Sequence, residues 1–133
     1  MKHTLIIKTT KREECIDITN QLNNILKKSN IKQGIFNVFV SHATAAIVIN
    51  ENADPNICDD LINCLSKLIP RGIWKHDRLD GNADAHLKAS ILGPSETIPI
   101  ANGNLQLGTW QAVMLVELDG PRERGIIINI IKG

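Results

Sequence analysis

Residues 125–131 read Gly-Ile-Ile-Ile-Asn-Ile-Ile, and this run near the end of the chain decides the fold class. A short, continuous, β-branched run predicts a strand rather than a helix. Side chains alternate between the two faces of a strand, so isoleucines lie on both faces here. We therefore expect the domain core to cover one face, and either helices or another subunit to cover the other.

Further apolar runs upstream predict the rest of a sheet. Residues 34–40 are typical of a central strand covered on both faces, and residues 45–49 of a second such strand. Three helices are expected: about ten residues from Thr19, a stretch from Asp54-Pro55 to Pro70, and a short helix capped by Asp84. Further strands are expected at residues 5–7, 15–18, 97–100 and 109–118, with a long loop at 71–81. This order predicts an α+β fold: one compact domain, 1–133, with a mostly antiparallel sheet or sandwich and two or three helices.

Composition excludes several classes of protein. Fifteen Lys+Arg against fourteen Asp+Glu leave a net charge of +1, so no concentrated basic face for nucleic acid or an acidic membrane is expected. Four aromatic residues, two Trp and two Phe, argue against base stacking. No apolar run is long enough to span a membrane, and the start does not resemble a signal peptide. Three cysteines without a CxxC motif are typical of free thiols in a reducing cytoplasm.

Histidines and carboxylates gather in the irregular segments between the apolar runs. The densest stretch, residues 76–86, carries two histidines, three aspartates and an asparagine. Converging with His42, the imidazoles of His76 and His86 would form the open three-ligand site of Zn²⁺ or a similar metal. Glu51 or Asp80 would then act as general base on metal-bound water. The alternative is a hydrophilic surface loop with incidental histidines, because His-x₉-His is not a recognised ligand spacing.

A second polar group surrounds the turn at Gly120-Pro121. Arg122 and Arg124 lie close to Glu117 and Asp119 there, and guanidinium groups suit phosphate or carboxylate recognition. The alternative is a solvated hairpin tip. On the short helix, Lys88 could reach an anion bound beside His86, although a solvated lysine would leave the same pattern.

Three segments together resemble the family of secondary thiamine-phosphate synthases. They are residues 42–55 (HATAAIVINENADP), residues 76–90 (HDRLDGNADAHLKAS), and residues 107–111 followed by 117–122. One departure is Ala43, where the family pattern has Thr after the histidine. The resemblance implies a compact antiparallel α+β domain, a homotrimer, and a histidine pocket at the subunit interface formed by His42, His76 and His86.

Three functions follow from these residues and this resemblance. The first is a thiamine-phosphate synthase, an enzyme that joins hydroxymethylpyrimidine diphosphate to thiazole phosphate and releases diphosphate. The second is a metal-dependent hydrolase or lyase acting on a small phosphorylated or carboxylated molecule. The third is a non-catalytic trimer that binds a metal or an anion. The expected roles are catalysis by Glu51, Asp80 and His86; substrate binding by Asn82, Lys88, Ser90 and Arg122; and binding of Zn²⁺ or Mg²⁺ by His42, His76 and His86.

Overall fold

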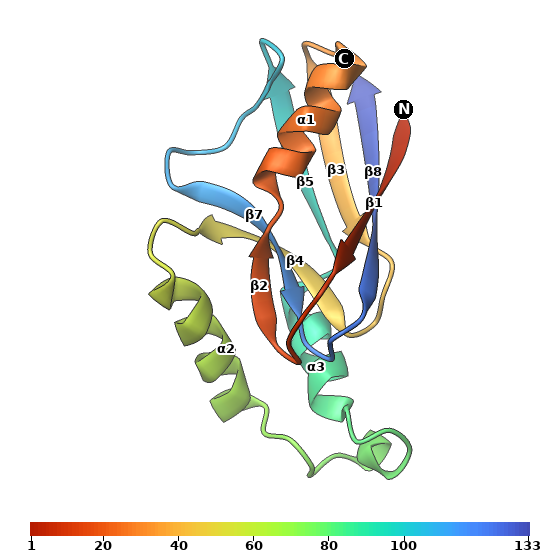
Figure 1. Ribbon diagram of the computed structural model, residues 1–133, viewed down its shortest axis with the longest axis vertical. Coiled ribbons are helices and arrows are strands. Elements are labelled where there is room, and N and C mark those ends of the chain that lie inside the picture. Colours follow the sequence, from red (N-terminus) through yellow and green to blue (C-terminus); the bar gives the residue numbers. More distant parts are fainter.

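Two antiparallel sheets form the centre of the fold in the computed structural model, which describes all 133 residues (Figure 1). The larger sheet has the strand order β1-β8-β3-β5-β6, and the smaller has the order β2-β7-β4. The strands are β1 (Lys2–Lys8), β2 (Glu14–Asp17), β3 (Gly34–Val40), β4 (Ala45–Glu51), β5 (Ser95–Ala101), β6 (Asn104–Leu105), β7 (Gln111–Glu117) and β8 (Glu123–Lys132).

Three α-helices and one 3₁₀ helix complete the domain: α1 (Thr19–Ser29), α2 (Asn56–Leu68), η1 (Lys75–Arg78) and α3 (Ala83–Leu92). Helix α1 buries one stripe, Leu22, Ile25 and Leu26, in the main core shared by the two sheets. Helices α2 and α3 pack against β2 and β4, the edge strands of the smaller sheet. The smaller sheet is therefore covered on both faces.

A second, smaller core fixes the position of α3. Ala85 and Ala89 of the helix pack against Ala46 of β4, Val116 of β7 and the adjacent Leu118. Alanine side chains allow a helix to approach a sheet closely, so the first turns of α3 lie against the ends of β4 and β7. This packing places His86, on the next position of the helix, beside the loops at that end of the sheet.

The α+β class, the single domain and the mostly antiparallel sheets are confirmed. The expectation that residues 34–40 are covered on both faces is wrong, because Ile35 and Phe39 are exposed on the outer face of the larger sheet. On the same face, Ile131 of β8 is 61% exposed. Asp84 does not cap α3 but lies inside it, buried. None of the helices combines the length and the apolar composition that crossing a lipid bilayer would require.

Candidate functional site

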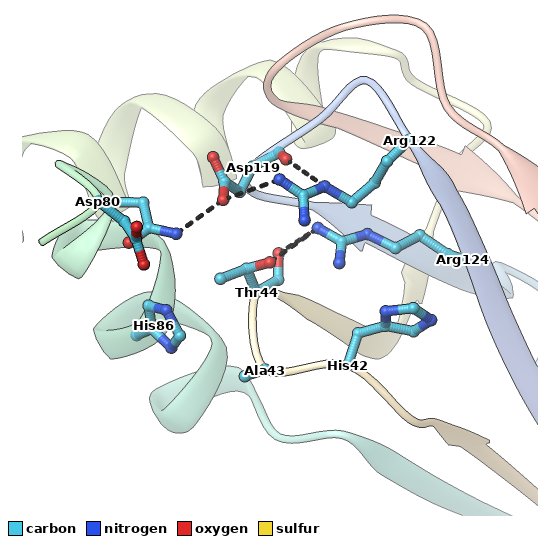
Figure 2. A pocket seen from close by; sticks show the side chains of 9 residues that line it. His42, Ala43, Thr44, Asp80, His86, Asp119, Arg122 and Arg124 are labelled. Atoms are coloured by element: carbon cyan, nitrogen blue, oxygen red, sulfur yellow. Dashed lines mark hydrogen bonds and ion pairs between the residues drawn. The ribbon is translucent and has the colours of Figure 1, made fainter.

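A polar cavity of about 510 Å³ opens at the end of the sheets where α3 begins (Figure 2). Its walls come from the loop joining β3 to β4, from the start of α3 with the loop before it, and from the β7–β8 connection. We call this cavity the anion pocket, and it is lined by His42, Ala43, Thr44, Asp80, Asn82, His86, Asp119, Arg122 and Arg124. Its volume is in the range of small-molecule sites, but its lining is far more polar than usual.

Arg124 is the buried cation of the anion pocket, with 1% of its surface exposed. Its Nε donates to Glu117 Oε1 at 2.9 Å, and its Nη2 donates to the carbonyl and hydroxyl oxygens of Thr44 at 3.0 and 2.9 Å. A further contact joins Nη2 to Glu117 Oε2. The remaining nitrogen, Nη1, donates to no protein atom, so it is free to bind a ligand in the cavity.

Glu117 holds Arg124 in this orientation. The carboxylate is fully buried and also accepts hydrogen bonds from Thr9 Oγ1 at 2.6 Å and from the backbone N–H groups of Leu118 and Asp119. Burial alone would raise the pKa of Glu117, but the hydrogen bonds from Arg124 and Thr9 outweigh it and hold the pKa below its usual value. Glu117 is therefore ionised at neutral pH, and the pair is fixed before any ligand arrives.

Gly120 lets the β7–β8 connection approach the N-terminal loop closely enough for the Thr9 hydrogen bond. A Cβ atom at this position would lie 2.4 Å from the carbonyl oxygen of Lys11 and 2.8 Å from Thr9 Oγ1. Any side chain there would push the two loops apart. The glycine is thus part of what holds Glu117 and Arg124 in place.

Arg122, like Arg124, is held by an acidic residue through its Nε and Nη2 atoms, but it lies at the surface. Its Nε donates to the carbonyl oxygen of Asp119 at 2.9 Å, and its Nη2 donates to Asp119 Oδ2 at 3.2 Å. The same Oδ2 accepts from Asn82 Nδ2 at 2.8 Å, which fixes the amide orientation of Asn82 because a carboxylate only accepts. Asn82 Oδ1 is buried and has no donor. A buried acceptor without a partner in the wall of a cavity is a place for a ligand or water to donate.

His42 is a neutral imidazole in this arrangement. The backbone N–H of Gly125 donates to its Nε2 at 2.9 Å, so the ring proton lies on Nδ1. Burial lowers the pKa of His42, and the positive charges of Arg124 and Arg122 lower it further against the opposing effect of Glu117. His42, which lines the cavity, therefore carries an N–H donor rather than a positive charge at neutral pH.

The prediction of a three-histidine metal site is wrong. His76 and His86 contact each other edge to face, with ring centroids 4.8 Å apart, while the Nε2 lone pair of His42 is occupied by Gly125. No three His, Cys, Asp or Glu side chains converge in a way that could hold a metal ion. His76 Nε2 lies 3.9 Å from Asp80 Oδ2, too far for a hydrogen bond. The residues present do not fit the expected Zn²⁺ or Mg²⁺ site.

Two residues predicted to act on substrate lie elsewhere. Glu51 ends β4, and Ala45 beside the anion pocket begins it, so at about 3.3 Å per residue the two are roughly 20 Å apart. Lys88 is only 2% exposed, and its Nζ donates to Asp84 at 3.1 Å and Glu13 at 3.2 Å. Lys88 is therefore part of an internal ion pair that ties α3 to the N-terminal loop, and neither expected role fits these positions.

The remaining predicted residues are brought together. Asp80, Asn82, His86 and Arg122 line the anion pocket, and Figure 2 shows Asp80 and His86 facing the flank that carries the two arginines. Ser90 donates to the carbonyl oxygen of His86 at 2.9 Å and lines a smaller neighbouring cavity of about 230 Å³ with His42 and His86.

Site prediction from the sequence gave no role to Thr44. It named Asp119 only as a neighbour of the arginine turn, which it treated as either a phosphate site or a solvated tip. The sequence did contain a signal for Arg124. Alternate residues of a strand share a face, so Arg124 lies on the same face as Ile126, Ile128 and Ile130, which all point into the core. An arginine on the buried face of a strand requires a buried partner. The site roles of Thr44 and Asp119 had no such signal, because both depend on where loops meet.

Fold and pocket together define a small antiparallel α+β protein with a cavity of guanidinium and imidazole groups. The chain belongs to the UPF0047 family, because the model of YjbQ-like UPF0047 proteins matches residues 3–133. The UPF0047 protein MJ1081 of Methanocaldococcus jannaschii is 50% identical over 94% of this chain and 90% of its own length. The UPF0047 protein YugU of Bacillus subtilis is 41% identical over 98% of this chain and 99% of its own.

Solved structures agree with this assignment. A YbjQ-like protein of unknown function from Sulfolobus solfataricus superposes with a TM-score of 0.96 at 41% identity, covering 100% of this chain and 97% of that one. A hypothetical protein from Aeropyrum pernix superposes with a TM-score of 0.95 at 37% identity, covering 100% and 99%.

These comparisons overturn the resemblance to secondary thiamine-phosphate synthases. The matching family and the two sequence relatives carry the name UPF0047, and none of these names is that of a synthase. Thiamine-phosphate synthesis, as predicted from the three segments, is therefore not supported. Metal binding, as predicted from the three histidines, is not supported by the arrangement of the side chains. The segments do mark the anion pocket, because they supply His42, Asp80, Asn82, His86, Asp119 and Arg122, but a shared pocket identifies a family and not a reaction.

Proposed function

We propose that the anion pocket binds a small molecule through a phosphate or carboxylate group, and that Arg122 and Arg124 hold this group. The observation that carries the proposal is Nη1 of Arg124, the nitrogen of this buried guanidinium that has no protein partner, on a side chain that lines the cavity. A charged donor without a protein partner gains a strong, charge-assisted hydrogen bond when an oxyanion arrives.

The acidic partners of the two arginines support this function rather than oppose it. Glu117 and Asp119 engage Nε and Nη2 of their arginines and leave Nη1 of each without a partner. The charge of each guanidinium is thus partly balanced while its orientation is fixed. Preorganised donors of this kind reduce the entropy lost on binding. The Nδ1–H of His42 adds a neutral donor on the same flank.

We further propose that the protein is an enzyme in which His86 and Asp80 exchange protons with the bound molecule. Both side chains line the anion pocket opposite the arginines (Figure 2). Imidazole and carboxylate groups are the usual general acids and bases, and each must lie within hydrogen-bond reach of the substrate. Supporting this role, neither His86 nor Asp80 has its side chain committed to a hydrogen bond within the protein.

The binding proposal is tested by replacing Arg122, whose side chain is half exposed, so that its replacement should leave the core intact. We expect Arg122→Gln to weaken the binding of inorganic phosphate about tenfold in isothermal titration calorimetry, because one charge-assisted contact is lost. Arg71→Gln is the matched control, since Arg71 is exposed and lies outside the anion pocket. Equal phosphate affinity in both variants would contradict the proposal.

We also propose that several copies of the chain associate through the outer face of the larger sheet. Ile35, Phe39 and Ile131 are exposed there, on strands whose other face is core, and no single chain covers them. Three copies is the number that the resemblance described under the sequence analysis implies. Light scattering should then report the mass of three chains of 14.7 kDa, and Phe39→Lys should lower it. A single-chain mass for the unaltered protein would refute association.

A cytoplasmic location is proposed on the state of the cysteines. Cys15, Cys58 and Cys64 are all free, as expected in a reducing compartment.

A further inference from the structure

An apolar cavity lies next to the anion pocket, and its lining residues other than His86 take no part in the proposed anion site. It has a volume of about 470 Å³ and is lined by Ile73, Trp74, Lys75, His76, Ala83, His86 and Leu87. Ile73 is 67% exposed and Leu87 is also exposed, so the cavity presents apolar side chains to solvent. We call it the apolar cavity. His86 lines both cavities, so the two share one wall.

The walls of the apolar cavity are held rigidly. Ala83, His86 and Leu87 are spaced i, i+3 and i+4 and form one face of α3. The loop opposite is tied to the helix by Asp77, which accepts from the backbone N–H of Trp74 and of Ala83, each at 3.0 Å. The indole of Trp74 donates to the carbonyl oxygen of Pro70 at 2.7 Å, which fixes its orientation. Side chains held in this way form a preformed surface.

Aromatic rings dominate this surface. Trp74, His76 and His86 all line it, and the rings of His76 and His86 meet edge to face at 78°. Flat apolar groups gain from stacking or edge contacts with such rings in addition to the burial of their area. The cavity therefore favours a flat, uncharged ring over a polar chain.

We propose that the molecule bound in the anion pocket also carries a flat apolar ring, which the apolar cavity receives beyond His86. This inference rests on the proposed function, because it assigns the second half of the same ligand. The ligand class is then an aryl or arylalkyl phosphate or carboxylate: the oxyanion contacts Arg122 and Arg124, the ring contacts Trp74 and Leu87, and His86 lies between the two parts.

The test compares inorganic phosphate with phenylalkyl phosphates that have zero to three methylenes between ring and phosphate, by isothermal titration calorimetry. We expect at least one of these esters to bind about tenfold more tightly than inorganic phosphate, because the ring buries apolar area. Leu87→Gln should remove this advantage and leave the affinity for inorganic phosphate unchanged. Ile91→Gln is the matched control: it lies one turn further along α3, is 68% exposed and lines neither cavity.

Each other outcome has a distinct meaning. If inorganic phosphate binds and no ester binds more tightly, this inference fails and the proposed function survives. If no phosphate compound binds, the proposed function fails as well. If the ester advantage persists in Leu87→Gln, the ring lies elsewhere and the inference fails. A last outcome is that no ester binds the unaltered protein more tightly than inorganic phosphate does, and that Leu87→Gln lowers the mass of an assembly. The apolar cavity is then a contact between copies of the chain, and the inference is again overturned.

Discussion

Replacing Arg124 by leucine is expected to lower the free energy of unfolding by about 3–5 kcal/mol. Arg124 and Glu117 form a fully buried ion pair, and the substitution leaves the Glu117 carboxylate without its compensating charge. Urea unfolding followed by circular dichroism would measure the loss. Arg124→Leu combined with Glu117→Leu should recover most of it, because two apolar side chains can replace a buried ion pair at little cost. A single variant as stable as the unaltered protein would show that the pair contributes nothing.

The same variant has a pH signature. In the unaltered protein the pKa of Glu117 lies below its usual value of 4.5, so its contribution to stability is complete above that pH and is lost as the pH falls below it. Without Arg124, burial should raise the pKa of Glu117, and protonation then relieves the penalty. The stability difference between Arg124→Leu and the unaltered protein should therefore narrow as the pH is lowered from 7 towards 4. A difference independent of pH would mean that lost packing, not charge, causes the destabilisation.

Ile128→Asp should prevent folding. Ile128 is fully buried at the middle of β8 and belongs to the main core, whose members are all apolar. Burial of an unpaired carboxylate costs more than about 4 kcal/mol, a large part of the stability of a domain of this size. Circular dichroism of the purified variant at pH 7 would show the loss of the native spectrum. A cooperatively folded Ile128→Asp protein would refute the burial assigned to this strand.

Asn129→Asp is the matched control for that experiment. Asn129 is the next residue of β8, points to the opposite face of the sheet and is exposed in the single chain. The same carboxylate is introduced one residue further along, so the net charge changes equally. Strand propensity falls only in Ile128→Asp, because isoleucine favours strands and asparagine does not, and this difference is worth about 1 kcal/mol at most. We expect Asn129→Asp to keep the native spectrum. If both variants unfold, the effect belongs to the strand and not to the core.

Prediction from the sequence was most successful for the elements with a clear periodicity. The stripe at Leu22, Ile25 and Leu26 predicts α1, and the isoleucine run of β8 predicts a strand, because burial of a regular face determines both. The start of α3 was misjudged at Asp84. A carboxylate near a helix start is equally typical of a cap and of an ion pair with Lys88 one turn later, and only the packing against Glu13 and Arg12 distinguishes them.

For the site, residue types were predicted better than roles. Crowding of histidines, aspartates and arginines indicated polar chemistry around residues 42, 76–86 and 122, and the anion pocket is built from these segments. The roles were not predictable, because they depend on single ring orientations and hydrogen bonds. The backbone N–H of Gly125 donates to the ring nitrogen lone pair of His42. Asp119 accepts from its neighbour Arg122 and also from Asn82, which lies 37 positions before Asp119 in the chain.

Local pattern in the sequence was enough for the fold class, the single domain and the inward side of most strands, since alternation and helical periodicity are properties of neighbouring residues. Tertiary structure alone decided that Arg124 is buried and keeps one guanidinium nitrogen without a protein partner. It also decided that Glu51 and Lys88 lie away from the anion pocket, and that the three histidines do not share a metal ion. Each of these outcomes depends on contacts between segments far apart in the chain. Their distances and directions are set by how the two sheets and α3 pack, and no local pattern encodes that geometry.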